Sequence, residues 1–299
     1  MRIMAPLSPN YSIPNLIQAG ANGFYLGYIS KNWLDTFGNG FFINRRGNTL
    51  NANFLDDTIQ PAIDGCHSLN ANVYCTFNNH QYTKNELDLI YQSILFLNDK
   101  HIDGIIASDI NVLSFCKQRG ISTILSTCAT NYSHYSCEFY KLFGVNRIVL
   151  PRDLTIEEMG AMIENVSGVE WEAFVYHSAC RFSESVCLSN HGQYGNICKR
   201  FRNLPQLAIK DGISRKVVDC YFDNPKGFCG LCQVYKLKQL GISWLKIVER
   251  TLPGEIIINT CNKVKTAVEL CEQVDSETAF KQIIEERESC IKGRMCYYN

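Results

Sequence analysis

Short apolar runs alternate with longer amphipathic stretches through the first 180 residues, and this alternation predicts the fold. Runs of this length that end in Gly, Asn or Pro are typical of buried strands. We therefore expect strands at residues 2–5, 23–28, 72–78, 104–109, 123–127, 147–151, 169–176 and 243–248. The run Glu255–Asn259 could add one more strand.

The stretches between these runs carry the spacing of helices. Ile59, Ile63 and Cys66 recur on one helical face, and Thr155 with Glu158 matches a capping box that would start a helix. We expect helices at residues 13–21, 55–70, 84–100, 111–119, 133–143, 155–165, 234–240, 263–274 and 276–292. Residues 29–54 are predicted as a loop region.

Repeated strand–helix units imply parallel pairing with right-handed crossovers. The chain has no GxGxxG after an early strand, so a dinucleotide-binding Rossmann fold is not indicated. We predict one α/β domain over residues 1–299, a (β/α) TIM-like barrel that is closed or nearly closed. An irregular cysteine-bearing insertion at 180–232 and C-terminal helices over 260–299 complete it.

Polar side chains follow many of the expected strands. In a parallel barrel the carboxyl ends of the strands form the reactive face, so these residues should meet at one mouth. They are Asn78, Asn79, His80, Asp109, Thr127 to Asn131, Arg152, Asp153, His177 to Cys180, Glu249 and Arg250.

Composition narrows the classes of function. Lys plus Arg equal Asp plus Glu at 29 each, so there is no basic excess to favour nucleic acid. The first residues lack the apolar region of a signal peptide, and no apolar run approaches the ~20 residues of a membrane span. We expect a cytoplasmic protein in which 15 cysteines indicate metal or redox chemistry.

Six cysteines are concentrated in the irregular segment. They are Cys180, Cys187, Cys198, Cys220, Cys229 and Cys232. Thiolates select iron–sulfur clusters, zinc or copper, and a zinc ribbon would need two tight CxxC pairs. The irregular spacing suits a cluster whose ligands come from separate loops.

The segment around these cysteines resembles peptidase family U32, the collagenase-like family. Glu172, Phe174, Cys180 and Cys187 occupy the matching positions of its Glu-x-Phe-x-x-Gly-x-x-Cys-x6-Cys signature. Gly195 with Cys198, and Cys229 ahead of Ser243–Arg250, match its later motifs. The resemblance covers roughly residues 3–250 and includes Asn44-Arg45-Arg46, Ala107–Asp109, Cys128–Asn131 and Arg147–Arg152. His177 and Val248 stand where the family has Gly and Glu.

The resemblance implies a [4Fe–4S] cluster held by Cys180, Cys187, Cys198 and Cys229, with Cys232 as the rival fourth ligand. Family members of this kind carry out oxygen-independent hydroxylation of ubiquinone precursors or RNA pyrimidines, with a prephenate-like oxygen donor. The substrate here is then a small molecule or an RNA base, and the chain either acts alone or pairs with a second U32 protein. A peptidase and a non-catalytic cluster-carrying partner are the alternatives. Neither HExxH nor GxSxG occurs in the chain.

Several polar residues are candidates for the chemistry of the site. His177, Glu172 and Asp109 are the proposed catalytic groups, and Asn44, Arg45, Arg46, Asn131 and Arg152 the proposed substrate-binding groups. Arginine forks suit the carboxylates of an organic acid. Equally, Arg45 and Arg46 could belong to a solvated loop, Arg152 could pair with Asp153 or another carboxylate, and His177 could bind a loop carbonyl. Glu172 lies mid-strand, where a buried carboxylate must be paired or functional.

Overall fold

Eight parallel strands close into a barrel in the computed structural model. Each strand pairs with the next along the chain, and β8 pairs with β1 to complete the ring. The structure describes residues 1–38, 42–45, 50–177, 184–187, 228–287 and 297–298. The strands are β1 Arg2–Pro6, β2 Gly23–Leu26, β3 Asn72–Phe77, β4 Gly104–Ala107, β5 Thr123–Leu125, β6 Val145–Val149, β7 Glu170–Tyr176 and β8 Trp244–Ile247. The predicted (β/α) barrel is confirmed and is fully closed.

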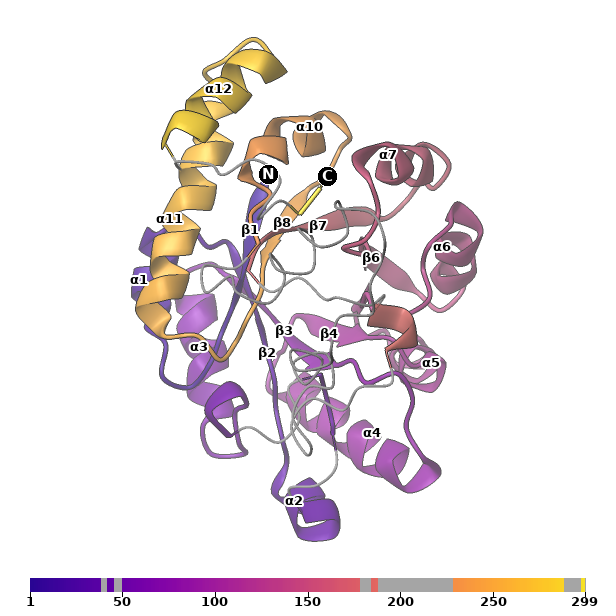
Figure 1. The fold of residues 1–299 in the computed structure, drawn as a ribbon. Coiled ribbons are helices and arrows are strands. Elements are labelled where there is room, and N and C mark those ends of the chain that lie inside the picture. The colour runs from indigo at the N-terminus through magenta and orange to yellow at the C-terminus, as the bar shows by residue number, and fades with distance from the viewer. Residues whose placement is uncertain (39–41, 46–49, 178–183, 188–227, 288–296, 299) are drawn as a thin grey trace, which may run out of the picture.

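Helices surround the barrel and connect successive strands (Figure 1). The described helices are α1 Ile13–Gln18, α2 Lys31–Phe37, α3 Ile59–Ser68, α4 Lys84–Asp99, α5 Ile110–Gln118, α6 His134–Lys141, α7 Ile156–Glu164, α10 Val234–Gln239, α11 Gly254–Leu270 and α12 Glu277–Arg287. Short 3-10 turns lie at Leu50–Ala52, Glu184–Val186 and Leu231–Gln233. The predicted capping box of Thr155 and Glu158 is present at the start of α7.

Two expected elements differ from the structure. The run Glu255–Asn259 is not a strand but the beginning of α11, where Ile257, Cys261 and Val264 are buried at helical spacing. The three consecutive isoleucines there favour a strand by propensity, and packing of one helical face overrides that preference. The loop expected after residue 28 also contains α2, which Ser30 caps through its side chain.

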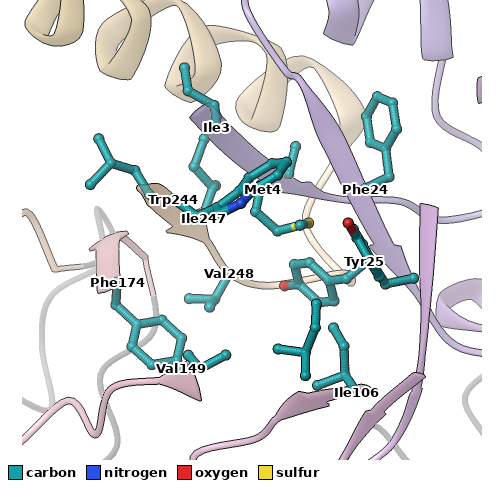
Figure 2. Packing of buried hydrophobic residues seen from close by; sticks show 14 of the residues in the cluster. Ile3, Met4, Phe24, Tyr25, Ile106, Val149, Phe174, Trp244, Ile247 and Val248 are labelled. Carbon is teal, nitrogen blue, oxygen red and sulfur yellow. The ribbon is translucent and has the colours of Figure 1, made fainter. Parts of the chain in front are cut away.

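Apolar side chains from several strands fill the barrel. Figure 2 shows Met4, Tyr25, Ile106, Val149 and Trp244 among the buried residues that pack there. Because helices cover the outside, the strands are buried on both faces, as the apolar runs of the sequence require. Access to polar chemistry is therefore left to the ends of the strands.

Candidate active site at the mouth of the barrel

A charged network crosses the barrel interior. The Glu172 side chain, which is fully buried, lies 2.6 Å from Lys246 Nζ and 3.2 Å from Arg147 Nη1. Glu172, Lys246 and Arg147 lie on the neighbouring strands β7, β8 and β6, respectively. All three side chains face the inside of the barrel. Glu172 thus points into the barrel and is paired, as its place in the strand predicts. Its proposed catalytic role stays a prediction.

The same network extends over aromatic rings. Arg147 Nε donates to Glu170 at 2.9 Å, and Arg147 Nη2 donates to the Tyr74 hydroxyl at 3.1 Å. The guanidinium lies 4.1 Å from the Trp244 ring. Burial opposes the charge of Arg147, but Glu172 and the other partners outweigh it and raise its pKa. A cation with this many contacts inside a barrel is held rigidly.

A second polar cluster joins the ends of β2 and β8. Arg250 Nη2 donates to Asn44 Oδ1 at 2.8 Å, and Arg250 Nη1 donates to the Ala52 carbonyl at 2.9 Å. Asn44 Nδ2 in turn donates to Asn53 Oδ1 at 2.8 Å. A Cβ on Gly27 would lie 1.9 Å from Arg250 Nη1, so only glycine leaves room for this cluster. Asn44 is fully buried within it, and its proposed substrate contact stays a prediction.

The loop that carries Arg45 is fixed to the end of β3. The backbone N–H of Arg45 donates to Asn78 Oδ1 at 3.3 Å, and the Tyr82 hydroxyl donates to the Ile43 carbonyl at 2.6 Å. Asn79 Nδ2 donates to the carbonyl of residue 42 at 3.2 Å. These bonds position Arg45 before any ligand binds.

The Arg45 side chain lies among groups from three other segments. Its Nη1 is 3.3 Å from His80 Nε2, and the Cys187 thiol is close enough to raise the pKa of the guanidinium. Burial lowers the pKa of Arg45, but Cys128, Cys187 and Glu184 nearby leave it raised. The loop is thus not simply solvated at Arg45: a cation borders a predicted cluster ligand there.

His80 is a neutral imidazole in this arrangement. Burial and the Arg45 guanidinium both lower its pKa. Because a guanidinium can only donate, His80 Nε2 accepts from Arg45, and Nδ1–H donates to the Cys128 carbonyl at 3.3 Å. Both ring nitrogens are engaged, so His80 is not oriented as a base toward a thiol.

Glu184 attaches residues 184–187, the Cys187 segment, to the barrel. Its Oε2 accepts from the Thr127 hydroxyl at 2.8 Å and lies 2.9 Å from Arg152 Nε. Arg152 also lies 4.1 Å from the Phe174 ring, which ends the inward face of β7. Arg152 thus forms an ion pair with a carboxylate other than Asp153, as one of its two interpretations predicts. Burial is the main cause that lowers the pKa of Lys246, and the charge of Arg152 lowers it further. Arg152 at the mouth therefore lies close to the charged network inside the barrel.

The Cys229 segment lies against the end of β7. Cys229 forms an antiparallel bridge with Tyr176, and the His177 N–H donates to the Phe228 carbonyl at 2.8 Å. The Gly230 N–H donates to the Val175 carbonyl at 2.8 Å. Cys229 is half-buried, and so is Cys232 in the following 3-10 turn. The backbone pairing places Cys229 beside the strand end from which Cys180 follows.

His177 is directed toward the outer helix α11. Its Nε2 lies 2.7 Å from the Thr260 hydroxyl, which itself donates to the Ile256 carbonyl. Its backbone adopts a φ of 65°, a left-handed conformation that turns the chain after β7. Burial lowers the pKa of His177 to about 4, with Glu249 acting in the opposite direction. This contact supports the structural interpretation, and an acid–base role stays a prediction.

Asp109 and Asn131 hold backbone at the mouth. Asp109 Oδ1 caps α5 by accepting from Asn111 N at 2.7 Å, and Oδ2 accepts from the Tyr82 N–H at 3.2 Å. Asn131 Nδ2 donates to the Val149 carbonyl at 3.1 Å, while its buried Oδ1 has no hydrogen-bond partner among the described residues. Asn131 Oδ1 is thus an acceptor still open to a ligand.

Three predicted site residues, Arg46, Cys180 and Cys198, lie outside the described residues. Among the residues that are described, no group of three or more His, Cys, Asp or Glu side chains could hold a metal ion. Arg147, Lys246, Glu184 and Cys128 had no individual role predicted from the sequence. The available signal for Arg147 and Lys246 was a charge within an apolar strand, and that for Cys128 was its place in the run Thr127 to Asn131 after a strand.

Comparison with known proteins decides the family. The model described as "Peptidase family U32" matches residues 12–297. The chain belongs to this family. A "Collagenase" of Porphyromonas gingivalis is 24% identical over 89% of the chain and 65% of its own length. The "tRNA hydroxylation protein P1" and "P2" of Bacillus subtilis are each 24% identical, over 80% and 90% of the chain and 59% and 85% of their own lengths.

Solved structures agree with the fold. "The Structure of the U32 Peptidase Mk0906" has a TM-score of 0.50 at 12% identity and covers 85% of this chain and 94% of its own. "Native KDPGal structure" has a TM-score of 0.52 at 8% identity, with 92% and 97% covered. At such identities these matches show the barrel alone. Within the described part of the chain, none of the helices combines the length and apolar character that crossing a bilayer requires.

Proposed function

We propose that the chain is an iron–sulfur enzyme of the U32 family that performs an oxygen-independent hydroxylation or a related redox step. The observation that carries this proposal is that Cys187 and Cys229 lie on separate segments that both attach to the mouth, the first to residues that follow β5 and β6 and the second to the end of β7. The relatives named as tRNA hydroxylation proteins favour the hydroxylation of RNA. The chain spans 65% and 59% of the first two curated relatives, so activity, substrates and partners are part of the proposal.

The described donor groups suit a thiolate-bound cluster. Cys187 and Cys229 would supply two ligands, and Cys180 and Cys198 the other two. Arg45 places a positive charge near Cys187, which favours an anionic group there. When bound, the cluster would supply a redox-active, Lewis-acidic centre at the barrel mouth.

The chain's own residues would bind and orient the substrate. Arg45 suits the carboxylate of an organic acid, such as a prephenate-like oxygen donor, because the loop beneath it is already fixed. Asn131 Oδ1, which is buried and has no partner in the part of the chain that the structure describes, could accept a hydrogen bond from a substrate N–H or O–H. Glu172, Lys246 and Arg147 would keep the floor of the site charged and rigid. Arg46 and Arg152 are the further substrate-binding candidates, and His177 and Asp109 the further catalytic ones.

The partner is proposed on the same grounds. Bacillus subtilis has relatives named P1 and P2, which is compatible with a U32 protein that works with a second one. A zero net charge gives weak attraction to bare RNA, so a small molecule or a base presented by a partner is also compatible with the site.

A peptidase is the second candidate, because one relative is named a collagenase. A hydrolase needs a nucleophile or a metal-bound water, and His80 is not oriented toward a thiol at this mouth. Peptide hydrolysis also has no need for iron and sulfide. Metal content therefore separates the two candidates.

The proposed activity can be tested in cells that lack their own U32 hydroxylases. Wild-type chain is expressed alone or with a co-encoded U32 protein, and hydroxylated pyrimidines in total tRNA are measured by mass spectrometry. We expect hydroxylation with wild type and with Cys116→Ser, and none with Cys187→Ser. Equal hydroxylation by Cys187→Ser would overturn the cluster-dependent mechanism, and peptide cleavage by an iron-free preparation would favour the peptidase.

A further inference from the structure

Tyr297 joins two chain segments that are far apart in the sequence. Its hydroxyl donates to the His177 carbonyl, and its backbone N–H donates to the Cys229 carbonyl at 3.0 Å. His177 is three residues before Cys180, so one residue connects the approach to the first predicted ligand with the fourth. Tyr297 is buried, which makes both bonds costly to lose.

The ring of Tyr297 continues the connection toward the second predicted ligand. It stacks on Phe174 with ring centroids 6.3 Å apart and an interplanar angle of 11°. Arg152 lies 4.1 Å from the same Phe174 ring and pairs with Glu184, three residues before Cys187. A stack of Tyr297, Phe174 and Arg152 therefore links the Cys229 segment to the Cys187 segment.

Tyr298 contacts the same strand and the same loop as Tyr297. Its hydroxyl donates to the Phe174 carbonyl at 2.5 Å, and its ring packs against Gly230, where an added Cβ would lie 3.2 Å from Tyr298 Cε2. The two tyrosines together contact β7 and the residues on both sides of Cys229. Such contacts fix the directions of ligand-bearing loops without touching the ligand sulfurs.

We propose that Tyr297 is a positioning residue for the cluster: it holds the Cys229 segment and His177 together and, through Phe174 and Arg152, aligns the Cys187 segment. This inference rests on the proposed function, because it concerns the assembly of the same cluster. It places a determinant of cluster stability more than sixty residues beyond the last predicted ligand.

The test measures cluster retention rather than activity. Wild type, Tyr297→Phe and Tyr297→Leu are purified without air and reconstituted with iron and sulfide. Loss of the visible absorbance to an excess of chelator is then timed below the unfolding temperature of every variant. Tyr297→Phe removes the hydroxyl bond alone, and Tyr297→Leu also removes the stack. We expect loss about 10-fold faster or more for Tyr297→Leu, as for other residues that support metal ligands, and an intermediate rate for Tyr297→Phe.

A matched control separates positioning from general stability. Leu97→Ala empties a buried site in the last turn of α4, before the start of β4 and so at the opposite end of the barrel from the mouth. It should lower the unfolding temperature without changing the rate of cluster loss. A Tyr297→Leu rate equal to wild type, or a Leu97→Ala rate as fast as Tyr297→Leu, would overturn the positioning role. A wild-type chain that binds no cluster would overturn the proposed function rather than the positioning role of Tyr297. Cys229→Ser is the reference variant, because it should lose the cluster if the proposed function is correct, whatever the role of Tyr297.

Discussion

Thiols of the barrel wall and thiols of the mouth share a residue type but have opposite surroundings. In the wall and its helices, Cys75 and Cys116 are fully buried, and burial raises the pKa of each to about 12. At the mouth, Cys187 lies near the Arg45 guanidinium, and Cys229 is half-buried beside Tyr176. Wall thiols therefore behave as small apolar groups, and mouth thiols as candidates for chemistry.

The charged residues show a similar division. Inside the barrel, Glu172 has two cationic partners and no exposure to solvent. At the mouth, Arg45 borders thiols and an imidazole and lies on a loop held by its backbone. The charges inside the barrel thus stabilise one another, whereas Arg45 at the mouth lies beside thiols and an imidazole, which are groups that can bind a metal.

The largest expected contrast is in alkylation of the cluster-free protein. At pH 8 we expect Cys75 and Cys116 to react with iodoacetamide about a thousand-fold more slowly than an ordinary exposed cysteine, because a pKa near 12 leaves little thiolate. Cys229, being half-buried, should react first. Peptide mass spectrometry over time measures the alkylation rate of each cysteine. Equal rates at Cys116 and Cys229 would contradict the expected difference between wall and mouth thiols.

Reconstitution sharpens the same experiment. Iron and sulfide should protect Cys187 and Cys229 from alkylation and leave Cys232 reactive. Protection of Cys232 with continued labelling of Cys229 would make Cys232 the fourth ligand. The wall thiols serve as internal references because their reactivity should not change.

Removing a charge should affect the two regions differently. Glu172→Gln leaves Arg147 and Lys246 buried with one partner fewer, and we expect the free energy of unfolding to fall by about 3–5 kcal/mol. Arg45→Met at the mouth should cost much less stability while speeding loss of the reconstituted cluster. Urea denaturation under reducing conditions measures the first effect. Glu157→Gln, on an exposed ion pair with Lys236, is the control and should change little.

A smaller effect is expected from pH, because His177 belongs with the wall rather than with the mouth. Its pKa is about 4 when folded and about 6.5 when unfolded, so the unfolded chain binds the extra proton between these values. The free energy of unfolding should therefore fall by up to about 3 kcal/mol as the pH decreases from 6.5 to 4. His177→Gln should flatten this slope, and an unchanged slope would contradict the burial of a neutral imidazole.

The sequence predicts most of the barrel because each strand is a local apolar run and each helix has its own cap or apolar face. It fails at residues 255–259, where three isoleucines favour a strand until the packing of Ile257 and Cys261 decides for a helix. Strand polarity also predicts correctly that Asn78, Thr127 and Arg152 meet at one mouth.

The contacts within the mouth could not be predicted in the same way. Arg45 reaches Cys187 only because Asn78 and Tyr82, from another strand–helix unit, hold its loop. His177 turns outward because its backbone φ is positive and because its side chain contacts the hydroxyl of Thr260, which lies 83 positions further along the chain. Such pairs depend on long-range packing, which neither spacing nor residue type records.

The central claim is that four cysteines at the mouth hold a cluster while the wall cysteines do not. Iron and acid-labile sulfide, quantified in protein purified without air, test it most directly. We expect about four irons per chain in wild type and in Cys116→Ser, and a colourless protein in Cys187→Ser and Cys229→Ser. A wild-type preparation that is fully active yet free of iron and sulfide would contradict the account.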